Sequence, residues 1–269
     1  SLNINKGSRV VFDLRNTAYI HYGDILFYLP AIIAISKTYN CIILSKQSNV
    51  DFISHFINNK ITISVNYTKI ISDIIITSPY SMFDDNNSNK IGLGLPTEYL
   101  TCKYPMFLFL KIMKILKINH SNKTYLNILD NIKYSERKKE SAEWEYKSIL
   151  TSPFIASGKF RDFFNFKRRK IIDIANHLSR DTDSNILLVG SDHEKSIHLE
   201  TNNSFDYRGK SILSVMSIAR NKNIYRAIGF DNFWMHYCNI IDKPYKPIFR
   251  GRFTKVQYTN HMNFINNSF

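Results

Sequence analysis

The sequence lacks a hydrophobic run long enough to cross a bilayer. Its densest apolar stretches, residues 28–35 and 106–110, fall short of the roughly 18–20 residues that a spanning helix needs. It also lacks an N-terminal charged segment followed by an apolar one, so we do not expect a secretory signal. These absences predict a cytoplasmic protein.

Cysteine is scarce as well. The three cysteines, Cys41, Cys102 and Cys238, are too widely spaced to form a zinc-binding pattern or a disulfide framework. We therefore expect a reducing compartment and no metal site. The G-x-x-x-x-G-K-[ST] spacing is missing too, which excludes a P-loop, and no internal repeat is present.

What the sequence does contain is apolar and basic residues. Of 269 residues, 44% are hydrophobic and 14% aromatic, which excludes a disordered chain and suits one large or two small domains. The excess of 36 Lys+Arg over 22 Asp+Glu gives a net charge of +14 and indicates an anionic partner. Because aromatic side chains can stack on bases, single-stranded nucleic acid is one such partner, although no recognition helix or RNA-binding motif supports it.

Strand-like and helix-length segments alternate along the chain, which is typical of βαβ units with parallel sheets. Strands are predicted at 9–14, 41–44, 61–65, 73–77, 149–156, 185–189, 224–228 and 246–249. Helices are predicted at 24–37, 50–57, 97–118, 166–178, 211–220 and 232–241, and a polar loop at 81–90.

A charged stretch divides the alternation into two halves. We predict a Rossmann-like domain over 1–133, a charged connecting helix over 134–148, and a second Rossmann-like domain over 149–269. The predicted fold class is α/β, with two Rossmann-like domains facing each other across a cleft. One long doubly wound sheet would produce the same alternation and stays open as an alternative.

Two acidic residues follow predicted strands, at the edge where parallel sheets bind ligands. Asp24 comes after Gly23 at a predicted helix start, where its carboxylate would accept a proton from a hydroxyl or simply cap the helix. Asp231 begins a segment that continues through Asn232 and Phe233 to His236, and the helix amides there suit a phosphate. His236 lies about 140° round the helix from Asp231, and a core position is its alternative role.

Basic residues and a further turn complete the candidates. Lys159 and Arg161 follow the strand at 149–156, where they suit a phosphate, whereas the run 167–170 fits a solvated helix face. Gly190 and Glu194 form a turn after the strand at 185–189, where Glu194 would accept ribose hydroxyls or cap the turn.

The apolar segment at 104–118 carries three lysines, Lys111, Lys114 and Lys117. It would either lie on an anionic bilayer or pack in the core with its lysines extended to solvent.

The order of these motifs resembles the bacterial heptosyltransferase family. Gly23-Asp24-Ile25 with Leu29-Pro30-Ala31 resembles the family's Gly-Asp-Val/Ile and Pro-Ala-Leu. Asp231, Met235-His236 and Lys243-Pro244 match its Asp-Thr-Gly-Pro-Met-His motif with the downstream Lys-Pro. The turn from Leu188 to Glu194 resembles Gly-Gly-x-x-Glu, and residues 205–211 resemble Leu-x-Gly-x-Ser.

The sequence also departs from the family. Asn232 stands in place of Thr, Phe233 in place of Gly, and only Gly190 of the paired glycines is present. The segment from Leu14 to Gly23 is longer than usual, and the chain is short. These departures put the donor sugar in doubt more than the architecture.

The resemblance implies a GT-B glycosyltransferase that transfers a sugar with inversion, without a metal or other cofactor. It implies Asp24 as general base, with Lys159, Arg161, Gly190, Glu194, Asp231, Asn232 and His236 at the donor. The implied donor is ADP-heptose and the acceptor a lipopolysaccharide or other surface glycan, met at the cytoplasmic face of the inner membrane. A UDP-, GDP- or CMP-linked donor is the alternative.

Overall fold

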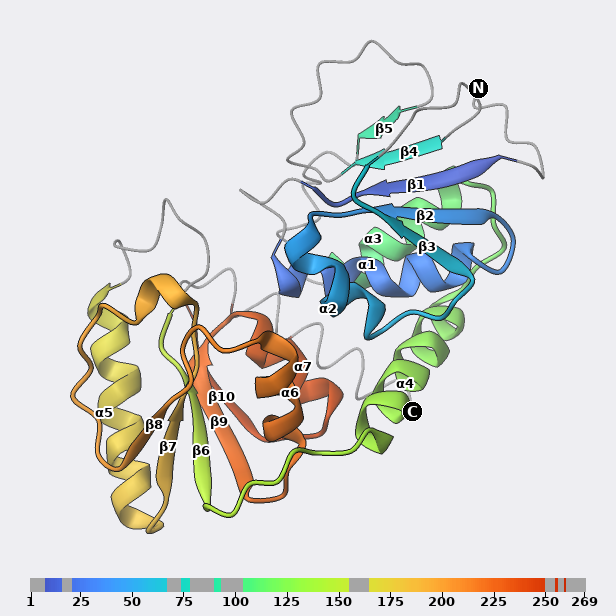
Figure 1. Ribbon diagram of the computed structural model, residues 1–269. Coiled ribbons are helices and arrows are strands. Elements are labelled where there is room, and N and C mark those ends of the chain that lie inside the picture. Colours follow the sequence, from blue (N-terminus) through green and yellow to red (C-terminus); the bar gives the residue numbers. More distant parts are fainter. Residues whose placement is uncertain are drawn as a thin grey trace. The chain divides into compact units, whose positions relative to one another are not determined.

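The computed structural model describes residues 8–15, 21–66, 74–77, 90–92, 104–154 and 165–249, together with Lys255 and Thr259. The chain divides into two compact units, Ser1–Asn131 with Lys255–Phe269, and Ile132–Thr254. Each unit has its own five-stranded parallel sheet, so the two-sheet prediction is confirmed over the single long sheet (Figure 1).

The first sheet has the order β3-β2-β1-β4-β5. Its strands are β1 (Arg9–Asp13), β2 (Asn40–Leu44), β3 (Ile61–Ser64), β4 (Ile74–Thr77) and β5 (Lys90–Gly92). Its helices are α1 (Tyr22–Ile35), α2 (Val50–Ser54), α3 (Tyr104–Ile115) and the first turns of α4 (Asn122–Lys138). Val10, Val11 and Phe12 in the central strand are fully buried, as expected of a parallel strand covered on both faces.

Helix α3 packs against α1. Its residues Leu108, Phe109, Ile112 and Met113 are buried, whereas Lys114 is exposed. The apolar side of this helix therefore belongs to the core of the unit, which favours the packing alternative over contact with a bilayer. Among the described residues, no helix combines the length and the apolar character that a membrane span requires.

Several boundaries differ from the prediction; α2, for example, ends at Ser54 and not at residue 57, and α5 continues to Asp181. Helix α3 (Tyr104–Ile115) confirms the central part of the helix predicted over 97–118, whose residues 97–103 lie outside the described residues. The polar loop at 81–90 lies outside the described residues except for Lys90, which opens the unpredicted strand β5.

The charged connecting helix predicted over 134–148 is helical only in its first residues, 134–138. Helix α4 starts at Asn122 and ends at Lys138, and the chain from 139 to 147 is not helical. The reason is Trp144, whose buried ring packs edge-to-face against Phe205 and Tyr207 and donates a hydrogen bond to Ser148 Oγ (3.1 Å). This apolar anchor ties the segment to the second sheet.

The second sheet has the order β10-β9-β6-β7-β8. Its strands are β6 (Ser148–Ser152), β7 (Asn185–Leu188), β8 (Ser204–Asp206), β9 (Ile224–Phe230) and β10 (Tyr245–Ile248). Helix α5 (Asn165–Asp181) packs on one face, and α6 (Ile212–Arg220) and α7 (Phe233–Ile240) on the other (Figure 1). Strand β8 was not predicted, because three residues are too few to show an alternating pattern.

Candidate functional site

The strand order of the second sheet reverses at β6. The chain runs from β6 to β7 and β8 on one side, and then returns to β9 and β10 on the other. In open parallel sheets, ligands bind outside the carboxyl ends of the strands at such a reversal. The segments that follow β6, β7, β8 and β9 therefore define the candidate site of this unit.

Asn232 joins two of these segments. Its Oδ1 caps α7 by accepting from the backbone N–H of Trp234 (3.0 Å). Its Nδ2 donates to Ser152 Oγ (2.7 Å) and to the carbonyl oxygen of Phe154 (3.1 Å), both at the end of β6. The side chain predicted to contact a donor thus fixes the start of α7 to the end of β6.

Asp231 and His236 flank that cap. Asp231 follows β9 directly and is 9% exposed, so its carboxylate lies at the sheet edge but largely inside the protein. His236 is on α7 and half-buried. Both predicted residues thus belong to the segment that opens at the strand reversal.

Gly190 and Glu194 form the turn after β7. The Oε2 atom of Glu194 accepts from the backbone N–H of Ser191 (2.5 Å), and the side chain is 2% exposed. A Cβ on Gly190 would lie 2.5 Å from that oxygen, so a larger residue here would displace the Glu194 carboxylate from its cap. In this conformation Glu194 caps the short helix at Asp192–Glu194, as the capping alternative predicted.

Arg208 is a site residue that the sequence reasoning did not single out. Its guanidinium pairs with both carboxylate oxygens of Asp206 (2.9 and 2.7 Å) and also donates to the carbonyl oxygens of Glu194 and Ile197. The hydrogen bonds from Arg208 lower the pKa of Asp206. The arginine side chain is 6% exposed. Because it binds Asp206 in β8 and carbonyl oxygens that follow β7, it holds the ends of these two strands together.

Phe154 lies near Arg208, Gly190 and Asn232, and the sequence did not indicate it either. It is 3% exposed, and the guanidinium of Arg168 lies 4.6 Å from its ring centroid. The predicted solvated face at 167–170 is therefore only half correct, since Arg168 is half-buried and Lys167 Nζ donates to Phe249 O (2.8 Å). The end of β6 is thus enclosed by an aromatic ring and basic side chains.

A buried polar cluster holds the middle of α7. The Tyr237 hydroxyl accepts from Arg220 (2.8 Å) and donates to Glu136 (3.1 Å), whose carboxylate is 1% exposed. Burial raises the pKa of Tyr237, and the negative charge of Glu136 adds to the shift. The ring of Tyr237 stacks on Phe233, with centroids 5.6 Å apart. The first residue of α7 is thereby supported from the core.

Asp24 occupies the corresponding edge of the first unit. It lies in the first turn of α1, and its Oδ2 accepts from the backbone N–H of His21 (2.9 Å) in a capping box. Its side chain is partly exposed. The Nε2 atom of His21 is buried and has no hydrogen-bond partner among the residues that the structure describes. Asp24 thus caps the helix and also presents carboxylate surface at the sheet edge.

The structure does not place every predicted residue at this edge. Lys159 and Arg161 lie outside the described residues. Lys243 binds the carbonyl oxygens of Asn221 (2.7 Å) and Ile224, at the amino end of β9, opposite the candidate edge. Burial lowers its pKa to about 8. Within the described ranges, no three His, Cys, Asp or Glu side chains are grouped as a metal site.

No protein-family model matches the sequence, and no curated protein matches it. Solved structures of similar fold were found, among them two of TibC. One is the dodecameric iron-containing heptosyltransferase TibC in complex with ADP-D-β-D-heptose, with a TM-score of 0.54 and 10% identity over 92% of this chain and 59% of TibC. The other is the dodecameric glycosyltransferase TibC from enterotoxigenic E. coli H10407, with a TM-score of 0.55 and 8% identity over 89% and 57%.

These likenesses concern the fold. The chain spans less than two thirds of the length of either TibC structure. The predicted α/β architecture, two Rossmann-like units with parallel sheets as in GT-B glycosyltransferases, is confirmed.

Proposed function

We propose that this protein is a glycosyltransferase that takes its sugar from a nucleotide-diphosphate donor. The observation that carries the proposal is the fold that nearly the whole chain shares with TibC, a heptosyltransferase crystallised with ADP-D-β-D-heptose. The order of the sequence motifs, which resembles the heptosyltransferase family, adds independent support.

The donor would bind at the carboxyl edge of the second sheet. The start of α7 offers backbone amides and the positive end of a helix dipole to the diphosphate, and Asn232 keeps that helix start in place. Asp231 directly precedes this helix start, and the turn at Gly190 follows β7, which is separated from β9 by β6. Lys159 and Arg161 would supply positive charge to the diphosphate, and His236 would support the α7 segment.

Asp24 would act as the general base. Its carboxylate would accept the proton of an acceptor hydroxyl while the hydroxyl oxygen bonds to the anomeric carbon and the nucleoside diphosphate leaves with the bonding electron pair. This single displacement inverts the anomeric configuration and uses no metal. General base catalysis of this kind contributes typically about 10²–10⁴-fold to the rate.

We propose a heptose as the transferred sugar and a lipopolysaccharide or other surface glycan as the acceptor. The net charge of +14 suits both a diphosphate and an anionic glycolipid at the cytoplasmic face of the inner membrane. Phe233 favours keeping a second candidate, a UDP-, GDP- or CMP-linked donor, because this bulky residue is the first of α7, at the helix start where the diphosphate is proposed to bind.

A nucleotide panel tests the proposal. Thermal unfolding is followed with ADP, UDP, GDP, CDP, CMP and, as a control without a diphosphate, adenosine. A ligand at 100 times its Kd stabilises the folded state by about 2.7 kcal/mol, so ADP should raise the melting temperature by several degrees and adenosine by much less. A larger shift with UDP, GDP or CMP identifies the alternative donor. No shift with any nucleotide at millimolar concentration refutes the proposal.

A further inference from the structure

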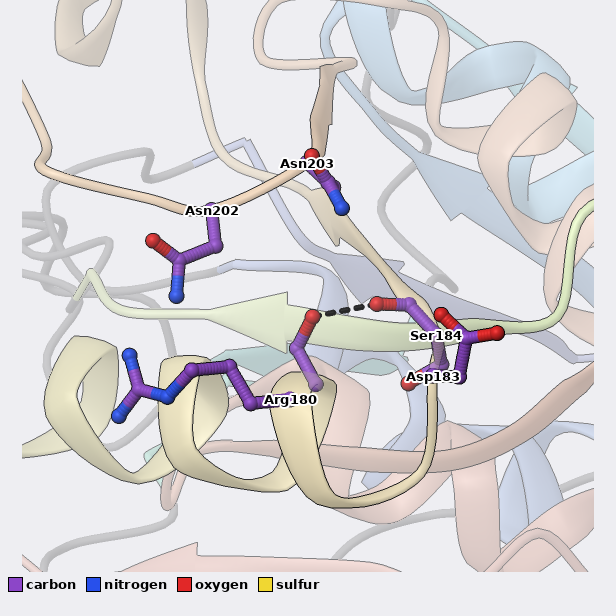
Figure 2. A pocket seen from close by; sticks show the side chains of 6 residues that line it. Arg180, Asp183, Ser184, Asn202 and Asn203 are labelled. Carbon is purple, nitrogen blue, oxygen red and sulfur yellow. Dashed lines mark hydrogen bonds between the residues drawn. The ribbon is translucent and has the colours of Figure 1, made fainter.

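The second unit carries a polar cavity that the proposed donor site does not use. It is open to solvent and has a volume of about 460 Å³. It lies at the amino ends of β7 and β8, beside the last turn of α5, whereas the candidate donor site is at their carboxyl ends. All six side chains that line it are polar: Ser179, Arg180, Asp183, Ser184, Asn202 and Asn203 (Figure 2).

Four of these side chains have unused hydrogen-bonding capacity. Among the described residues, the side chains of Arg180, Asp183, Asn202 and Asn203 have no hydrogen-bond or ion-pair partner. Arg180, Asp183 and Asn203 are exposed and Asn202 is half-buried, so a guanidinium, a carboxylate and two amides border the cavity with donors and acceptors open to solvent and available to a ligand.

The cavity wall is held in place by other hydrogen bonds. Asn176 on α5 donates to Glu200 O (2.7 Å) and accepts from the backbone N–H of Asn202 (2.8 Å). The Ser179 hydroxyl donates to Ser184 O, as drawn in Figure 2. These hydrogen bonds hold the backbone of the turn at 202–203 against α5, and the end of α5 against the start of β7, before any ligand arrives.

Two lining residues have a positive φ, a backbone conformation that glycine adopts most easily. Asp183 has a φ of 45° and Asn203 a φ of 35°. Asp and Asn are the non-glycine residues that tolerate this region best. Both turns therefore keep a polar side chain at the cavity, where glycine would have left only backbone.

The charges at the cavity select among ligands. Arg180 and Asp183 contribute one positive and one negative charge, and the carboxyl end of α5 presents carbonyl oxygens with a partial negative charge. An anion would meet both the carboxylate and the helix carbonyls. A ring with several neutral hydroxyl groups, each able to donate and accept, matches the mixed set instead.

We propose that this cavity is a second, non-catalytic site that binds an uncharged sugar residue of a glycan. Arg180, Asn202 and Asn203 donate to ring hydroxyls, and Asp183 accepts from them. The site does not depend on the proposed glycosyl transfer, since it lies at the opposite edge of the sheet and needs no nucleotide.

Backbone-amide NMR of the intact protein tests this site. D-glucose, D-mannose and N-acetylglucosamine are titrated separately to high millimolar concentration, with inorganic phosphate as the anionic comparison. At least one sugar should shift the amide signals of Asp183, Asn202 and Asn203 in a saturable way, and phosphate should not.

Matched variants make the result specific. Arg180→Ala and Asn202→Ala should each weaken sugar binding about three- to tenfold, the effect of losing one or two hydrogen bonds. Arg169→Ala changes an exposed arginine near the other end of α5 and should leave binding unchanged. The nucleotide-induced rise in melting temperature should be the same in all three, which separates this site from the donor site.

Three results would overturn the proposal. The first is that none of the three sugars shifts the amide signals in a saturable way. The second is that Arg180→Ala binds sugar as tightly as Arg169→Ala does. The third is that phosphate shifts the same amide signals more than the sugars do. Loss of the nucleotide effect alone, with sugar binding intact, would contradict the proposed function and leave this site standing.

Discussion

Replacing Asp24 by asparagine separates its two roles, the helix cap and the proposed base. Asparagine keeps an oxygen that can accept from the His21 N–H, at 2.9 Å in the native protein, but it cannot take up a proton. Losing the negative charge in the first turn of α1 costs about 0.3–1 kcal/mol of stability. Losing a general base lowers the transfer rate about 10²–10⁴-fold, or about 3–5 kcal/mol of activation free energy.

Alanine at the same position removes the cap as well. Asp24→Ala should cost a further 0.5–1.5 kcal/mol or so in stability, because the His21 N–H loses its partner. Its transfer rate should match that of Asp24→Asn, because both variants lack the base. Asp51→Asn is the control, since Asp51 is an exposed acidic residue in the first turn of α2.

The assays are urea unfolding and sugar transfer from the nucleotide donor that the panel selects. The reasoning predicts two nearly equal rates and two different stabilities for the Asp24 variants. Wild-type turnover in Asp24→Asn would remove Asp24 from the mechanism. A slow Asp24→Ala beside an active Asp24→Asn would show that the residue matters only as a cap.

Two further predictions concern buried groups. Glu136→Gln should destabilise the protein by about 3–5 kcal/mol in urea unfolding, because the charge of Arg220, which is 9% exposed, then lacks its buried counter-charge. The control is Glu143→Gln, at an exposed position, which should change the stability by less than about 0.5 kcal/mol. Burial raises the pKa of the Cys41 and Cys238 thiols to about 12. Above about pH 9 the unfolded chain therefore releases thiol protons that the folded chain keeps, so the free energy of unfolding falls as the pH rises. Replacing both cysteines by alanine should flatten the curve of unfolding free energy against pH between about pH 9 and 11; an unchanged slope would mean that these thiols ionise in the folded protein.

The fold was largely predictable because its main signals are local. Buried strands such as β2 and β7 are short apolar runs, and the helices between them carry apolar residues at helical spacing. The failures are equally physical. Trp144 sits in a charged, helix-compatible stretch, and only its packing against Phe205 and Tyr207 pulls the chain out of a helix. That contact joins segments about sixty residues apart, and no local pattern reveals it.

The site follows the same division between local and long-range contacts. The cap made by Glu194 joins residues three apart in the sequence, and the pattern Ser191-x-x-Glu194 predicted it as one of two alternatives. Arg208 was missed because its partners, the carbonyl oxygens of Glu194 and Ile197, are brought near only by the pairing of β7 with β8.

Asn232 shows how a departure from a family pattern acquires a physical reason once the fold is known. The amide accepts from the N–H of Trp234 and donates to both Ser152 Oγ and the carbonyl oxygen of Phe154. A threonine hydroxyl has a single hydrogen to donate, so it could cap α7 and reach one of the β6 partners but not both. The two β6 partners lie 80 and 78 residues earlier in the sequence, which is why the substitution looked like a weakness of the resemblance. In the structure it is the residue that fixes the start of α7 to the end of β6, where the diphosphate is proposed to bind.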